Sequence, residues 1–202
     1  MIVADPNWQY KAYSEKGQAR APERHYKTSP LTDICSIPVR EVAGKDSHLA
    51  LWITGPHIVL GWHVSVMQAW GFEPSSMGFV WVKPKKGSAS VKRPLGPVSV
   101  EDFVLGLGHT TRQNAEFVIL GRRGRPRRYS KSIHQLIVEP RREHSRKPEA
   151  FYTAIEEYAG HGSSKLEMFA RQQRRGWTVW GDQTTKFGGA PTAQREKNEP
   201  AA

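Results

Sequence analysis

Short apolar runs recur along the whole chain, each bounded by polar residues, glycine or proline, and several of them predict fully buried β-strands. Their apolar positions are continuous rather than alternating, which is typical of strands that are covered on both faces. The runs do not form an internal repeat. The expected strands occupy residues 1–4, 48–54, 77–82, 115–121, 133–138, 165–170 and 177–180.

Three segments between these strands have helical patterns. Residues 56–71 begin with proline, carry apolar residues at i, i+4 and i+7 from Leu60, and end in glycine, which predicts a helix of about four turns. Residues 148–160 again run from proline to glycine, and Phe151, Ile155 and Tyr158 share one face. A shorter helix is expected to begin at Ser29-Pro30.

The alternation of strands and helices predicts an α/β sheet that is covered on both faces. In such sheets ligands bind at the carboxyl ends of the strands, and Asp5 follows the first strand directly. Residues 83–113 are rich in glycine, proline, serine and lysine and are expected to form a long loop. We therefore expect one domain over residues 1–187, followed by a disordered tail over 188–202.

The charge balance indicates a polyanionic partner. The 202 residues carry a net charge of +11, and residues 121–147 hold ten Lys and Arg against two Glu. A solvated basic face is the plainer interpretation, but interleaved Gly, Pro and Tyr favour a segment that follows phosphates. The candidate nucleic-acid contacts are Tyr26, Arg122, Arg123, Arg125, Arg127, Arg128, Arg141 and Arg142.

The cysteine and histidine residues argue against disulfide bonds and bound metal ions. Cys35 is the single cysteine, so no disulfide can form within the chain, and no Cys or His pair has zinc-finger spacing. The longest apolar stretch is interrupted at residues 55–57, and the first residues lack the layout of a signal peptide. We expect a cytoplasmic protein with no metal and no membrane contact.

The stretch "ADPNWQY", residues 4–10, is the strongest candidate for chemistry. Asp-Pro-Asn is ordinary turn chemistry, and a plain turn is one interpretation. The other is that the Asp5 carboxylate and the Pro6 carbonyl each accept an N–H from an exocyclic amine while Trp8 stacks on the base. An aromatic amine is a poor nucleophile, because its lone pair is delocalised, and two acceptors would stabilise the positive charge that develops on it. Such a base must first leave its stack.

This stretch resembles the "DPPW" motif of the N6-adenine methyltransferase (MTA) family, which includes the catalytic subunit of the eukaryotic mRNA adenosine methyltransferase and bacterial and phage DNA enzymes. Further blocks follow in the family's order and together cover residues 1 to about 183. They are "HYKTS" (25–29), "LALWIT", "VMQAWGF" (66–72), "FVWVK", "TRQNAEF", "PRREHSRKP", "KLEMFARQQRRGW" and "WGDQ".

The resemblance implies a Rossmann-like class I methyltransferase fold in permuted order, with the catalytic loop before the cofactor-binding strand. It also implies S-adenosylmethionine as the cofactor. Lys147 would pair with the methionine carboxylate, and Glu167 and Arg171 would hold the ribose hydroxyls. The remaining implied cofactor residues are Asp5 at the ammonium, Phe169 as a wall, Gln172 and Gln173 beside methionine and ribose, and Asp182 and Gln183 at the adenosine end. The implied catalytic residues are Asp5, Pro6, Asn7 and Trp8.

Two positions depart from the family pattern. Asn7 replaces a second proline and Asp182 an asparagine, but the acceptors on Asp5 and Pro6 are intact. Plainer interpretations also stand: Lys147 could simply precede a helix, and Glu167 could face solvent. Glu116 could support the catalytic loop or lie on the surface, and His25 and Tyr26 could gate the adenine pocket or pack.

These observations favour methylation of the adenine N6 amino group in DNA. RNA is an alternative substrate, and a non-catalytic nucleic-acid-binding partner with a weakened loop is a third possibility, motivated by Asn7. No separate target-recognition domain is evident, so specificity is short or a second subunit supplies it; a homodimer is also possible.

Overall fold

The computed structural model describes residues 1–9, 28–88, 99–106, 110–143 and 145–188. The expected tail lies outside these residues except for Gly188, as do His25 and Tyr26. None of the helices within these ranges is long and apolar enough to cross a membrane.

A seven-stranded sheet forms the centre of the molecule, in the order β5-β3-β4-β2-β1-β6-β7. Six strands run parallel to one another, and β4 runs antiparallel to both of its neighbours. Every expected strand is present. Their bounds are β1 Ile2–Ala4, β2 Ser47–Ile53, β3 Glu73–Val82, β4 Ala115–Arg123, β5 Leu136–Val138, β6 Leu166–Met168 and β7 Thr178–Trp180.

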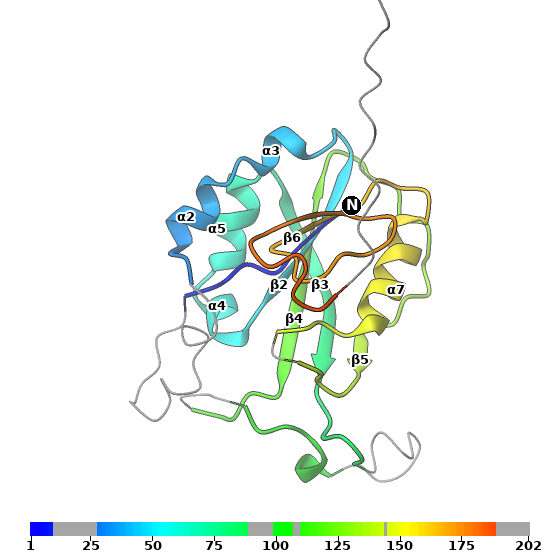
Figure 1. The fold of residues 1–202 in the computed structure, drawn as a ribbon. Helices are drawn as coiled ribbons and strands as arrows, with labels where there is room; N and C mark the ends of the chain where they lie inside the picture. Colours follow the sequence, from blue (N-terminus) through cyan, green and yellow to red (C-terminus); the bar gives the residue numbers. More distant parts are fainter. Residues whose placement is uncertain (10–27, 89–98, 107–109, 144, 189–202) are drawn as a thin grey trace, which may run out of the picture.

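Helices cover both faces of this sheet, as the alternating pattern predicts (Figure 1). On one face lie α2 (Leu31–Ser36), α3 (Val39–Val42), α4 (Gly55–Val59) and α5 (Trp62–Ala69), and on the other lies α7 (Glu149–Ala159). Strand β2 shows why its sequence is continuously apolar. Leu49 and Leu51 pack with the first group of helices, whereas Ala50 and Trp52 pack with α7.

One expected helix is divided into two. The apolar stripe over 56–71 predicts a single helix, but α4 ends at Val59 and α5 begins at Trp62. Gly61 lies between them with φ 71°, a left-handed conformation that glycine adopts without steric cost. The chain turns there, so that Leu60, which belongs to the predicted apolar stripe, is 64 % exposed.

The strand order brings the first strand next to a strand that comes late in the sequence. β1, which leads into Asp5, pairs in parallel with β6, so that Ala4 lies opposite Met168. The same edge of the sheet receives the end of β2, the end of β3 and the start of β4. The loop that carries Asp5 therefore precedes in sequence the strand that carries Glu167, which is the expected permuted order.

The connection over residues 83–113 is the expected long loop. Its described part contains one short 3-10 helix, η2 (Val100–Asp102), and a single β-bridge between Pro84 and Phe103. It extends beyond the same edge of the sheet (Figure 1).

Glu139 caps α7. Its carboxylate oxygens accept the backbone N–H groups of Glu149 at 3.2 Å and Ala150 at 3.1 Å. Glu139→Ala should lower the free energy of unfolding by about 1 kcal/mol, because two N–H groups at a helix N-terminus lose their acceptor. Urea unfolding followed by circular dichroism measures this loss. The exposed Glu157→Ala on the same helix is the control, and equal stabilities of the two variants would show that the cap contributes nothing.

Candidate active site

The Asp5 loop is fixed at the end of β1 by its own backbone and by a neighbouring segment. The Trp8 N–H donates to the Pro6 carbonyl at 2.8 Å, which makes a tight turn. The Asn7 side-chain amide donates to Ser29 Oγ at 2.9 Å, and the Ser29 N–H donates to the Asn7 carbonyl at 2.9 Å. Asn7 thus contributes a side-chain hydrogen bond that a second proline could not make. One lone pair of the Pro6 carbonyl remains for another donor.

Trp8 anchors this loop to the sheet. Its indole N–H donates to the Trp52 carbonyl at 3.0 Å, and its ring stacks on His57 with centroids 5.6 Å apart. Trp62 packs against it at 6.1 Å. The ring is only 6 % exposed, so its observed contacts position the loop. Stacking of Trp8 on a base stays a prediction.

His57 is a site residue that the sequence analysis did not identify. Burial lowers the pKa of His57, although its hydrogen bond to the Gln9 carbonyl opposes this, so the ring is neutral at pH 7. Its Nε2 lies 2.9 Å from that carbonyl and its Nδ1 2.8 Å from Thr54 Oγ1. The carbonyl can only accept, so Nε2 donates and Nδ1 accepts the threonine hydroxyl. A histidine directly after Gly-Pro inside an apolar stretch was the available signal.

A buried ion cluster surrounds the Asp5 carboxylate. Lys147 Nζ lies 3.0 Å from Asp5 Oδ1 and 2.7 Å from Glu116 Oε2. Lys83 forms an ion pair with the other oxygen of Glu116. The Lys147 side chain is 9 % exposed, so its ammonium is held between two carboxylates with little access to water.

The close charges and the burial shift the pKa values of Asp5, Glu116 and Lys147. Burial raises the pKa of Asp5, and the Lys147 ammonium opposes that shift only in part. Burial alone would also raise the pKa of Glu116, but Lys147 and Lys83 together lower it to about 2. Burial would lower the pKa of Lys147, but the two carboxylates raise it. Lys147 therefore stays charged at neutral pH and keeps a positive charge beside Asp5.

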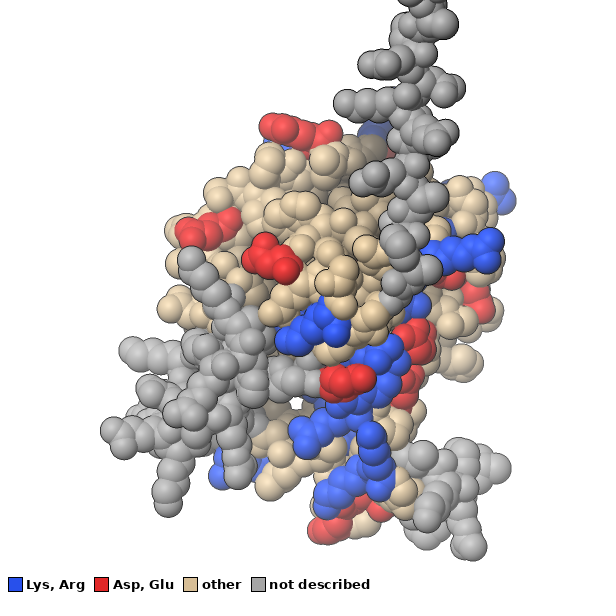
Figure 2. Space-filling view, viewed as in Figure 1, with Lys and Arg blue, Asp and Glu red and all other residues tan. Residues whose placement is uncertain are grey.

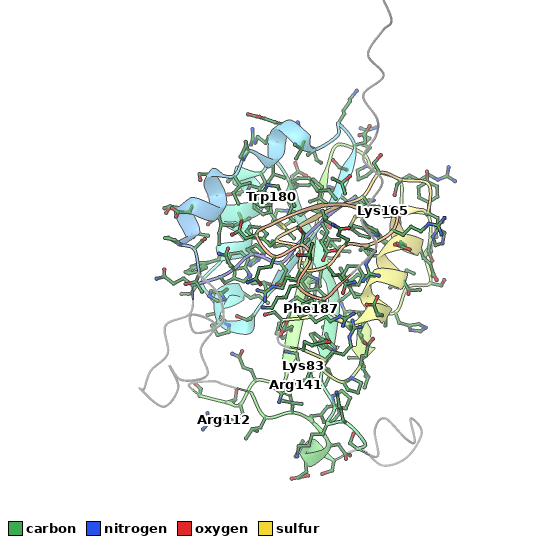
Figure 3. The ribbon with its side chains drawn as sticks, viewed as in Figure 1. Lys83, Arg112, Arg141, Lys165, Trp180 and Phe187 are labelled. Carbon is green, nitrogen blue, oxygen red and sulfur yellow. The ribbon has the colours of Figure 1, made fainter. Side chains whose placement is uncertain are left out.

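A cavity of about 420 Å³ opens in front of Asp5, within the size range of small-ligand sites. Asp5, Pro6, Trp8 and His57 line one side. Figure 2 shows Lys and Arg side chains gathered in a band on the lower half of this face. Figure 3 shows Lys83 and Arg141 at this lower edge, below Phe187. The basic residues that line the cavity are Lys83, Arg141, Arg142, Arg146 and Lys147.

A second cleft lies behind the ion cluster. It brings together six of the predicted cofactor residues, Asp5, Lys147, Glu167, Phe169, Arg171 and Gln172. The Glu167 side chain accepts the Tyr152 hydroxyl at 2.6 Å through Oε1, but Oε2 is buried without a hydrogen-bond partner among the described residues. A buried carboxylate oxygen without a donor is costly, so a ligand hydroxyl at Oε2 fits this cleft. Burial also raises the pKa of Glu167.

Phe169 holds a strained backbone conformation at the end of β6. Its φ is 59°, a left-handed value that bulky residues rarely adopt and that clusters at functional sites. Gly181 permits this turn, since a Cβ at Gly181 would lie 3.0 Å from the Phe169 Cα. The Phe169 ring contacts the edge of Trp180 at 5.5 Å.

The other predicted cofactor residues are placed differently. Gln173, Asp182 and Gln183 do not line the described part of this cleft, and Asp182 is exposed. The segment after β7 nevertheless returns to the cleft, where the Phe187 N–H donates to the Arg171 carbonyl at 3.0 Å. The Lys147 ammonium, expected at the cofactor carboxylate, contacts Asp5 and Glu116 and borders both cavities.

The structure divides the predicted basic segment between opposite edges of the sheet. Arg122 lies six positions after Glu116 in β4, a distance of about 20 Å along a strand. Residues 122–128 therefore lie far from Asp5. The Arg123 guanidinium donates to the carbonyls of Arg40 at 2.9 Å and Ala43 at 3.2 Å, which is a structural role. Of the predicted contacts, Arg141 and Arg142 line the catalytic cavity.

Among the residues that the structure describes, no group of three or more His, Cys, Asp or Glu side chains could hold a metal ion.

Comparison with known proteins identifies the fold and its relatives. The MT-A70 family profile matches residues 1–183. The chain is 27 % identical to the type II methyltransferase M.MunI of a Mycoplasma species, over 90 % of this chain and 76 % of the relative. It is 28 % identical to the human N(6)-adenine-specific methyltransferase METTL4, over 93 % and 38 % of the two chains. It is 26 % identical to the N6-methyladenosine RNA methyltransferase MTA1 of Cryphonectria parasitica, over 93 % and 52 %. This chain thus spans about half of the length of MTA1 and less than half of the length of METTL4.

The ion cluster predicts a pH-dependent contribution to stability. The pKa of Glu116 is about 2 in the folded protein and 4.5 when unperturbed, so ionised Glu116 stabilises the fold above pH 4.5, and this is lost as the pH falls through 2. The shift corresponds to about 3 kcal/mol. Glu116→Gln should lower the unfolding free energy most at pH 7, and the difference from wild type should shrink between pH 5 and pH 2. Urea unfolding at several pH values measures it, with Glu157→Gln as the control. Parallel stability curves for wild type and Glu116→Gln would contradict the assignment.

Proposed function

The chain belongs to the MT-A70 family, and from this premise we propose that residues 1–187 form a domain that methylates the N6 amino group of adenine in DNA, with S-adenosylmethionine as the methyl donor. One observation carries the proposal: the Asp5 carboxylate lies between a basic cavity and a cleft in which Glu167 Oε2 lacks a donor. A nucleobase would enter from the first side and the cofactor from the second.

The cleft residues suit the cofactor by their chemistry. Glu167 Oε2 would accept a ribose hydroxyl, and Arg171 and Gln172 would add donors from the same wall. Asp5 would receive the cofactor's ammonium. When bound, S-adenosylmethionine supplies a methyl group that its sulfonium makes electrophilic.

Asp5 and Pro6 would activate the amine. The Asp5 carboxylate and the Pro6 carbonyl would each accept one N–H, which would stabilise the positive charge that the nitrogen acquires as it takes the methyl group and the methyl–sulfur bond breaks. The amine would then lose one proton, which the Asp5 carboxylate could accept. The Lys147 ammonium favours the ionised form of Asp5 and so opposes the rise in its pKa that burial causes.

DNA is favoured as the substrate because the type II methyltransferase M.MunI is matched over 76 % of its length, more than the other two relatives named above. RNA is the second candidate, because MTA1 is named as an RNA methyltransferase and is matched over 52 % of its length. Labelled S-adenosylmethionine with matched DNA and RNA oligonucleotides, digested to nucleosides, decides between them. Labelled N6-methyladenine should appear mainly from DNA. Label found mainly in RNA would make RNA the substrate instead of DNA. Label in neither nucleic acid, under conditions where the cofactor is bound, would refute catalysis.

Asp5→Asn should reduce turnover at least about 100-fold, because a neutral amide stabilises charge at the nitrogen poorly. Affinity for a DNA oligonucleotide should change less than about threefold, since charge at the nitrogen develops only in the transition state. Single-turnover methyl transfer and fluorescence anisotropy measure the two effects. The exposed Asp33→Asn on α2 is the matched control, and near-normal turnover in Asp5→Asn would refute the catalytic assignment.

The two parts of the basic segment should differ in their effect on nucleic-acid binding. Arg141→Gln, at the cavity, should reduce the slope of log affinity against log salt by about one, as expected for one lost phosphate contact. Arg127→Gln, at the opposite edge of the sheet, should leave that slope unchanged. Anisotropy titrations over a salt series test this pair. A reduced slope in Arg127→Gln alone would place the nucleic acid on the other edge.

A further inference from the structure

A second groove lies directly beside the catalytic cavity. It has a volume of about 570 Å³, and His57 lines both spaces. The turn between α4 and α5 contributes Val59, Leu60 and Trp62, and the end of the long loop contributes Gln113. The groove therefore begins where the catalytic cavity ends.

The chemistry of the two spaces is different. The catalytic cavity is lined by five Lys and Arg side chains, whereas the described lining of the groove contains no Lys, Arg, Asp or Glu. The groove instead offers the aromatic ring of Trp62, two aliphatic side chains and the amides of Gln9 and Gln113. An aromatic or apolar surface with side-chain amides at its border is what proteins use to bind an unstacked nucleobase, through stacking and edge hydrogen bonds. A phosphate would need cations there.

The contact surfaces of the groove are exposed and held in place. Val59 is 87 % and Leu60 64 % exposed, because the chain turns at Gly61. The His57 ring packs 4.6 Å from Trp62 and is fixed through Thr54 and Gln9. The Gln113 amide lies over Gly55, where a Cβ would approach its Nε2 to 3.5 Å. The groove is thus built on the same supports as the catalytic loop.

Positive charge at the margin supports a nucleotide as the occupant. Arg112 is exposed between two lining residues, Thr111 and Gln113. Figure 3 shows it in the lower half of the molecule, below and to the left of Lys83 and Arg141. A strand whose target base enters the catalytic cavity would pass His57 with its phosphates toward these cations.

We propose that this groove binds the base of a nucleotide adjacent to the target adenine in the same strand and thereby gives the enzyme a preference for its neighbouring base. The inference rests on the proposed function, because it takes the cavity at Asp5 as the site of the target base. Trp62, Val59 and Leu60 contact the face of the neighbouring base, and Gln113 contacts its edge. A bidentate amide contact distinguishes bases by roughly tenfold or more.

The first test measures methyl transfer to oligonucleotides that contain one adenine, with each of the four bases placed in turn on its 5′ and its 3′ side. Wild-type kcat/KM should vary about tenfold or more with the base on one side. Gln113→Ala should reduce this range to within about threefold. Gln68→Ala, an exposed glutamine on α5, is the matched control and should keep the full range. A range that Gln113→Ala leaves unchanged would overturn the groove assignment.

The second test measures binding without catalysis. Labelled oligonucleotides that carry an intact nucleotide, or an abasic nucleotide on the 5′ or on the 3′ side of the adenine, are titrated against wild type and Gln113→Ala. The abasic site should weaken wild-type binding about tenfold, because both the stacking and the amide contact are lost. It should weaken binding of the variant clearly less. An equal loss of affinity in wild type and Gln113→Ala would refute the proposal that the groove binds the neighbouring base.

The two proposals fail in distinguishable ways. Absence of methyl transfer from every oligonucleotide would refute the proposed function, and the binding test would still decide whether the groove accepts a base. Methyl transfer without any preference for a neighbouring base would instead refute the groove and leave the function standing.

Discussion

The Lys147 ammonium, held between the Asp5 and Glu116 carboxylates, is the interaction on which the site depends. The three side chains come from the residue after β1, the start of β4 and the segment just before α7, so that one ammonium joins distant parts of the chain. Two carboxylates buried this close together would repel each other, and either alone would be costly to bury. The ammonium between them offsets both costs. Lys83 satisfies the second oxygen of Glu116 and completes a cluster with two positive and two negative charges.

Around this cluster, the strand ends create three spaces with different chemistry. The cleft at Glu167 offers a buried carboxylate oxygen, the cavity at Asp5 offers cations, and the groove beyond His57 offers an aromatic ring and amides. Each suits a different part of a methylation reaction: a cofactor, a target nucleotide and a neighbouring base. The Asp5 loop lies where all three meet, and Trp8 and His57 keep it there.

The basic residues that are clustered in the sequence do not all lie on one surface of the structure. Residues 121–147 read as one cluster, but β4 carries Arg122 and Arg123 to the edge of the sheet opposite Asp5. The chain then returns along β5, and Arg141 and Arg142 reach the catalytic cavity. Arg123 moreover donates to two carbonyls of the α3 region, so part of the charge serves the fold. The face that carries the cavity is basic because of residues from both sides of the long loop.

The sequence by itself determined the strands, the helix α7 and the α/β class, because a buried strand needs a continuous apolar run whatever its neighbours are. The family motifs also predicted site roles for Asp5, Lys147 and Glu167, since a motif is tied to positions in the chain. Only the tertiary structure decided which of these groups meet. It divided the helix over 56–71 at Gly61, placed His57 against Trp8, directed Lys147 to Glu116 and separated Arg127 from Arg141. These outcomes depend on strand order and direction, which bring together residues far apart in the sequence and which no local pattern encodes.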